Sequence, residues 1–353
     1  MAIEYRLRRM GPSVFFCRAI PSRCPRPERL LVERARHLPA QRRFNLHGQP
    51  LMRCLACAGA AILWMAALFT SPASAAPGKA GGATLYEQLA DLNAQLSSES
   101  GQSRSDAVVR LYRQLTADVH PCLQGQGSAG DFNDDDLFRA TAFAELYSLE
   151  VADVDALGCL YRKLAAAGVL TRWHTQTYAG ALVSVSRYSE ANELRERTEA
   201  PGLPVLPQLQ VPRVSAGQGW RMLSIQDRLH AQVQAWNPEA HHPHVVAVVH
   251  PACAFSVRAL SEIEQRPELQ WLRDKLLLVV PPDASLPLDG ILAWNTAHPS
   301  LPMHPMYLRA DWKALTSLDT PTFYLVRDGH VVGSFEGWPN QQGVAALRAG
   351  LSR

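Results

Sequence analysis

Cys253 is the residue of this chain whose position best suits it for chemistry. It follows a short run of mostly β-branched residues, 245–249, which predicts a buried strand. Apolar residues then recur at helical spacing between positions 255 and 263. Cys253 is therefore expected in the first turn of a helix, where unpaired N–H groups and a partial positive charge favour the reactive thiolate.

The neighbours of Cys253 restrict what that sulfur can do. Ser256 stands three residues later, and its hydroxyl can donate a hydrogen bond to a thiolate but cannot resolve a disulfide by exchange. His250, three residues earlier, either adds positive charge when protonated or simply faces solvent. The site can therefore hold a client thiol as a mixed disulfide or reshuffle disulfides with an external thiol. The alternative is a small buried cysteine in an inactive domain.

A metal site is a second chemistry that these residue types allow. Imidazole and thiolate groups are suitable ligands, but only one cysteine lies near the histidines, and histidines flanked by proline in a linker are usually solvated. We therefore expect neither a metal nor a cofactor. The residues concerned are His241, His242, His244, His250 and Cys253.

The elements that must position Cys253 follow it in the chain. Residues 275–280 predict a second core strand, and a third strand opens at Thr320-Pro321. An Asp328-Gly329 turn then leads into the strand of residues 330–335 and a last helix. The longer segment 281–318 is interpreted as an insertion that covers the site, with disorder or a structural wrap as alternatives.

This order of elements resembles the thioredoxin fold over roughly residues 220–351. In that family the bond before the proline is cis, and the preceding residue pairs with an extended substrate backbone; Thr320 and Pro321 match these positions. The resemblance implies thiol–disulfide exchange, with Cys253 as the attacking residue. The chain departs from the family at Ser256, where thioredoxins carry a second cysteine.

The first 76 residues predict an export signal preceded by an extension. Residues 1–51 hold eleven Arg and three acids, and are interpreted as an upstream over-extension of the reading frame or a disordered basic tail. From Met52, residues 52–76 combine one Arg, an apolar run and the small-residue exit Ala73-Ser74-Ala75, which is typical of a cleaved signal peptide. We expect a periplasmic or secreted protein without a stable membrane anchor. The alternative is a basic cytoplasmic tail with an uncleaved anchor.

Cleavage after residue 76 changes both the charge and the cysteine count. It leaves 23 of the 35 Lys and Arg and 29 of the 32 Asp and Glu, a net charge of −6, which argues against nucleic-acid binding. Cys122, Cys159 and Cys253 remain, and an odd count suggests one pair and one free thiol. In an oxidising compartment we expect a Cys122–Cys159 disulfide; the alternative is two unrelated small apolar residues.

The rest of the chain predicts a helical domain and a linker. Apolar stripes at helical spacing cover residues 84–199, and the stretch 179–194 resembles a tetratricopeptide-type helix pair, with an irregular helical bundle as the alternative. Prolines recur between residues 201 and 212, which is typical of a stiff linker. Residues 217–223 predict a short strand, and residues 224–236 predict a helix.

Taken together, these patterns predict a two-domain α+β protein. A helical domain (77–200) is joined by a Pro-rich linker (201–219) to a thioredoxin-like α/β domain (220–353). The expected function is engagement of client thiols or disulfides, or of an external thiol reductant, through Cys253. The alternative is a non-catalytic interaction protein whose helical domain binds a partner.

Overall fold

The computed structural model describes residues 83–119, 133–198, 202–212, 219–238 and 242–352. All of these belong to the same compact unit, within Gly82–Arg353. The predicted N-terminal extension (1–51) and signal (52–76) lie outside the described residues, so both stay predictions. In the part that is described, no helix is both long enough and apolar enough to cross a membrane.

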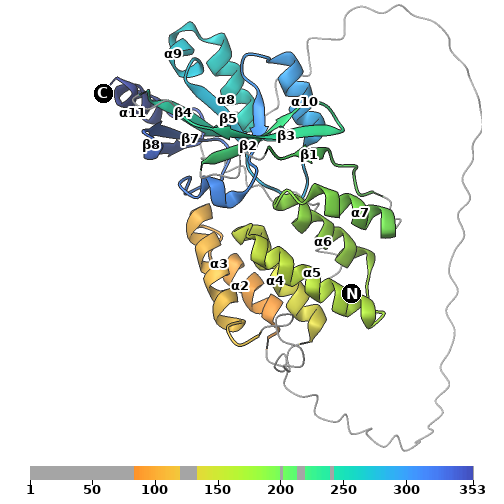
Figure 1. Cartoon of the computed structure of the whole chain (residues 1–353). Coiled ribbons are helices and arrows are strands. Elements are labelled where there is room, and N and C mark those ends of the chain that lie inside the picture. The colour runs from red at the N-terminus through yellow and green to blue at the C-terminus, as the bar shows by residue number, and fades with distance from the viewer. Residues whose placement is uncertain (1–82, 120–132, 199–201, 213–218, 239–241, 353) are drawn as a thin grey trace, which may run out of the picture. The chain divides into compact units, whose positions relative to one another are not determined.

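Helices fill the described chain up to residue 198, as the apolar stripes predict, and Figure 1 shows them packed against one another. Side chains cap four of their N-termini: Thr84, Ser100, Asn133 and Thr171 each accept a hydrogen bond from a backbone N–H of the first turn. The helices are α2 (Leu85–Gln95), α3 (Gly101–Leu115), α4 (Asp134–Ser148), α5 (Val151–Ala166), α6 (Arg172–Ser184) and α7 (Tyr188–Thr198).

The predicted helix pair is formed by α6 and α7. They contact each other, and Ala179 and Ala181 of α6 are buried together with Ala191 of α7. The small side chains let the two helices approach closely. Whether this pair belongs to a tetratricopeptide-type unit stays a prediction.

The predicted helix at residues 224–236 is wrong, because this segment belongs to a β-hairpin. Strand β2 (Trp220–Ile225) pairs antiparallel with β3 (His230–Trp236). The Asp227 carboxylate accepts from the backbone nitrogens of Leu229 and His230, which stabilises the turn. At the open end Trp220 lies opposite Trp236, with their rings 5.5 Å apart.

The second sheet has five strands in the order β6-β5-β4-β7-β8. The central strand β4 runs parallel to β5 and antiparallel to β7, and β7 pairs antiparallel with β8. The α+β class is confirmed, and the edge strand β6 comes from the segment 281–318. The bounds are β4 His244–Val248, β5 Leu276–Val280, β6 Met303–Pro305, β7 Thr322–Arg327 and β8 His330–Glu336, followed by α11 (Gln341–Leu351).

Alternate residues of β4 face two different cores. Val245 and Ala247 pack with buried side chains of α8 (Ala254–Gln265), α10 (Leu288–Ala297) and α11, which cover one face of the sheet (Figure 1). Val246 and Val248 face the other side, where Met222 of the hairpin and Trp312 of the 3₁₀ turn η3 (Arg309–Trp312) cover them. Since both faces are covered, the strand reads as a continuous apolar run.

The segment 281–318 is ordered structure rather than disorder. It forms α10, the edge strand β6 and η3. A short 3₁₀ helix η2 (Pro267–Leu269) and α9 (Gln270–Arg273) connect α8 to β5. The insertion therefore lengthens the sheet by one strand and brings Trp312 to the second face.

The helices and the hairpin share one hydrophobic core. Leu223 of β2 and Val233 of β3 are fully buried in the same cluster as the apolar residues of α2 to α7. Leu206 joins this cluster, and β1 (Gln208–Gln210) pairs parallel with β3. Thus β1 lies inside the segment that the prolines predict as a linker.

Gly343 provides a test of how α11 packs on the sheet. A Cβ at Gly343 would lie 2.3 Å from the ring of Phe335. Alanine normally favours a helix interior over glycine by about 1 kcal/mol. We expect the reverse here: Gly343→Ala lowers the free energy of unfolding by about 1–3 kcal/mol, because the methyl group overpacks the ring. Urea-induced unfolding of both proteins measures this change in the free energy of unfolding.

Gly333→Ala is the matched control, because nothing lies within 4 Å of its Cβ position. Equal effects of the two substitutions on the unfolding midpoint would contradict this packing of α11.

Candidate functional site

Cys253 occupies the position that the sequence predicts for it. It is the N-cap residue of α8, directly after the loop that leaves β4, and its backbone nitrogen donates to the carbonyl oxygen of His250 at 3.0 Å. Its Sγ lies 3.4 Å from the carbonyl oxygen of Thr320, and the Thr320–Pro321 peptide bond is cis. The structure therefore brings together Cys253, Thr320 and Pro321 from distant parts of the chain.

The state of the sulfur differs from the exposed free thiol that was expected. Only 4% of Cys253 is exposed, and the residue is disulfide-bonded. Since a disulfide sulfur carries no proton, only the reduced form can use the 3.4 Å contact to Thr320 as a hydrogen bond.

Ser256 and His250 support the loop rather than the sulfur. Ser256 is fully buried, and its Oγ accepts from the backbone nitrogen of His250 at 3.3 Å. The Nδ1 of His250 in turn accepts from the backbone nitrogen of Ala252 at 3.2 Å. Burial lowers the pKa of His250, so the neutral imidazole is favoured at neutral pH. His250 therefore supplies no positive charge to Cys253 there.

The remaining predicted residues are described only in part. Cys159 lies on α5 and is disulfide-bonded, but Cys122 lies outside the described residues, so their pairing stays a prediction. His241 is also outside. Among the residues that the structure does describe, no three or more His, Cys, Asp and Glu side chains gather as a metal would require.

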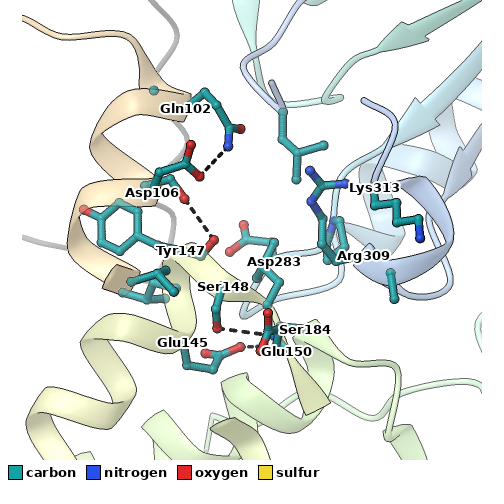
Figure 2. Close-up of a pocket in the computed structure, with 18 of the residues that line it drawn as sticks. Gln102, Asp106, Glu145, Tyr147, Ser148, Glu150, Ser184, Asp283, Arg309 and Lys313 are labelled. Carbon is teal, nitrogen blue, oxygen red and sulfur yellow. Dashed lines mark hydrogen bonds between the residues drawn. The ribbon is translucent and has the colours of Figure 1, made fainter. Parts of the chain in front are cut away.

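A cavity of about 910 Å³ lies between the N-terminal helices and the loops after β5 and β6 (Figure 2). Its walls come from α3, the end of α4, the start of α5, residues 282–284 and residues 308–319. Asp319, which directly precedes Thr320, is one of the lining residues. The α3 backbone approaches this loop so closely that a Cβ at Gly101 would lie 2.7 Å from Asp319 Oδ2.

Glu145 is the most deeply buried acid of this cavity, with 2% of the residue exposed. Burial, together with the nearby carboxylates of Asp153 and Asp283, raises its pKa to about 7, against the lowering effect of the Ser184 hydrogen bond. The Oγ of Ser184 lies 2.5 Å from Glu145 Oε1 and 2.8 Å from the carbonyl oxygen of Ala181. Because a serine hydroxyl has one proton for two acceptors, this geometry also suits a protonated Glu145 that donates to Ser184.

Asp283 is the second acid with a strongly raised pKa. Its Oδ1 accepts from the backbone nitrogen of Ala284 at 2.6 Å. Its Oδ2 is shielded from solvent and has no hydrogen-bond partner among the described residues. Burial raises the pKa of Asp283 to about 6, against the lowering effect of the Ala284 hydrogen bond.

Sequence reasoning missed Glu145 and Asp283. Glu145 lies in an ordinary helical pattern, and Asp283 follows a strand within the segment interpreted as an insertion. The usable signal was Asp283 in the loop that follows the apolar strand β5, three residues after its end, since the loops after parallel strands often face a site. Nothing in the local sequence relates it to Glu145.

The raised pKa of Glu145 predicts a pH-dependent stability. A carboxyl group with a pKa of about 7 when folded and 4.5 when unfolded stabilises the folded state below pH 4.5, and this contribution is lost as pH rises through 7. We expect the unfolding free energy to fall by about 2–3 kcal/mol from this group between pH 5 and 8. Glu145→Gln should remove that part of the slope in urea titrations.

Glu150→Gln serves as the control, because the Glu150 side chain is 60% exposed at the same cavity. It should keep the wild-type slope. Identical slopes for the wild type and both variants would refute a desolvated Glu145.

Comparisons with known proteins give one structural likeness. No family model matches the chain, and no curated protein matches it. A crystal structure of a thioredoxin-like protein from Bacteroides caccae ATCC 43185 is similar, with 10% identity and a TM-score of 0.26. The match covers 78% of this chain and 96% of that chain. At this TM-score the likeness carries no information about the residues around Cys253.

Proposed function

We propose that the chain is a thioredoxin-like protein that exchanges disulfides with client proteins through Cys253. The observation that carries the proposal is the placement of a disulfide-bonded sulfur at the N-terminus of α8, 3.4 Å from the Thr320 carbonyl oxygen and beside cis-Pro321. A helix N-terminus stabilises the thiolate that exchange releases.

The exchange step follows from which sulfur can be reached. Cys253 Sγ is buried, so the incoming thiolate of a client or of an external thiol attacks the partner sulfur of the bond. A new S–S bond forms between these two sulfurs. The old bond breaks, and its electron pair leaves with Cys253 as the thiolate. One thiolate and one disulfide are consumed and one of each is produced, so no further oxidant is needed.

The released thiolate can then attack a client disulfide and hold one half of it as a mixed disulfide. Ser256 cannot resolve that bond, and its hydroxyl is already directed to the His250 backbone. Resolution therefore comes from a second client cysteine or from an external thiol. This supports a holding or isomerase-like role rather than that of a self-contained dithiol reductase.

Thr320 and Pro321 are the proposed contact for an extended client backbone. Thr320 is 4% exposed, and its Oγ1 is buried without a hydrogen-bond partner among the described residues. Because Thr320 is buried, the side chains that shield this loop must move before a client strand can bind. Such a step also provides access to the disulfide.

The burial of Cys253 favours a second candidate function. A sulfur with 4% exposure can serve as a structural disulfide in a domain that no longer reacts. In that case the protein is a non-catalytic scaffold, and its helices and cavity bind the partner. The two functions differ in whether the Cys253 disulfide of the folded protein reacts with external thiols.

The full chain, equilibrated in glutathione buffers of graded redox potential and then alkylated, tests the proposal. We expect Cys253 to become alkylated at potentials above about −300 mV, where structural disulfides resist reduction. Mass spectrometry of peptides should also find glutathione attached at Cys253, and Cys253→Ser should abolish that adduct.

Cys159 is the internal reference in the same samples, since it is disulfide-bonded on α5, away from a helix N-terminus. Labelling of Cys253 only after unfolding, or in parallel with Cys159, would support the scaffold instead.

A further inference from the structure

Two acids that line the cavity in Figure 2, Glu145 and Asp283, form no ion pair with a Lys or Arg among the described residues. Burial raises the pKa of both acids, the carboxylates of Asp153 and Asp283 also raise the pKa of Glu145, and no Lys or Arg is among the influences on either. Asp283 Oδ2 lacks a hydrogen-bond donor among the described residues. Two desolvated acids that repel each other form a site where a bound cation is favoured.

Arg309, a half-buried basic residue of the opposite wall, already makes hydrogen bonds; the buried basic lining residue is Arg104 of α3. The two terminal nitrogens of Arg309 donate to the carbonyl oxygens of Trp312 and Leu315, at 2.6 and 2.8 Å. Burial lowers the pKa of Arg309. Lys313, which Figure 2 shows beside Arg309, also lines this wall and is exposed to solvent. Backbone carbonyls thus satisfy the terminal nitrogens of Arg309, whereas Asp283 Oδ2 has no donor among the described residues.

The cavity also offers apolar surface of ligand size. Its volume of about 910 Å³ is within the range of small-molecule sites. Leu146 and Val151 line it, and each is 44% exposed. Large apolar side chains left open beside buried polar groups are the usual composition of a ligand pocket.

We propose that this cavity binds an organic cation, with a primary ammonium group at Asp283 and Glu145 and an apolar body against Leu146 and Val151. The torsion at the end of an aspartate side chain is broad, so the Asp283 carboxylate can turn an oxygen toward the ligand. The ammonium donates the hydrogen bond that Oδ2 lacks. This binding does not depend on the exchange chemistry of Cys253.

Proton release accompanies this binding. An ammonium next to Glu145 and Asp283 favours their ionised forms, so both lose protons when the ligand binds near pH 6.5. The other acids that face them are Asp153, beside Glu145, and the lining residues Asp106, Glu150 and Asp319. The basic lining residues are Arg104, Arg110, Arg309 and Lys313.

Calorimetry on the full chain with 2-phenylethylamine tests the proposal. The matched probes are 3-phenylpropionate, which carries the opposite charge on the same ring, and neutral 2-phenylethanol. We expect the amine to bind at least about tenfold more tightly than either, the factor of one charged hydrogen bond. In buffers of different ionisation enthalpy, binding should release protons at pH 6.5 and none at pH 8.5.

Asp283→Asn tests whether the ammonium group of the ligand lies at Asp283. The substitution keeps an acceptor for the Ala284 nitrogen, so the fold should persist, and affinity for 2-phenylethylamine should fall at least about tenfold. Glu150→Gln, at the exposed rim, should leave affinity within about twofold.

Five results would overturn the proposal, four of them with the wild type or Asp283→Asn. These four are no binding of the amine, equal binding of amine and carboxylate, unchanged affinity in Asp283→Asn, and binding at pH 6.5 without proton release. An equal loss in Glu150→Gln would place the amine at the rim and also refute it.

Discussion

The candidate thiol site depends on the register of one strand, β4. Its parallel pairing with β5 and antiparallel pairing with β7 put Val248 opposite Thr322, two residues after Thr320. The chain leaving β4 therefore meets the loop entering β7, and the start of α8 follows directly. A register shift of one residue would turn the inward-facing valines of β4 to the other face. The position of Cys253 is thus set by backbone pairing as much as by its own surroundings.

The elements around β4 could be predicted because their signals are local. A continuous apolar strand, the helical spacing after Cys253 and the Asp328-Gly329 turn each occupy a few residues, and the structure has all three. The hairpin β2–β3 was predicted as a helix because its stabilising contacts are not local. Trp220 and Trp236 meet only after the chain reverses, and both rings also contact Trp312.

The thiol site at Cys253 and the acidic cavity also differ in how far local sequence signals predict them. Cys253 and Pro321 stand out in the sequence because a reactive residue follows a strand and a proline opens one. The state of the sulfur did not follow, since burial and bonding depend on distant segments. The acidic cavity has no sequence signature at all: Glu145 belongs to α4 and Asp283 to the loop after β5, and folding alone brings their charges together.

The hydrophobic core shared by the helices and the hairpin has a further consequence. Leu223 and Val233 are buried by helices that precede them in the chain, and Gly180 of α6 approaches Ala284 so closely that a Cβ there would lie 3.0 Å from the Ala284 methyl carbon. The portion of the chain that holds the five-stranded sheet therefore does not form a module that could be moved by itself. A fragment cut near residue 205 would expose apolar surface and lose one wall of the acidic cavity, so recombination or truncation at that point is disfavoured.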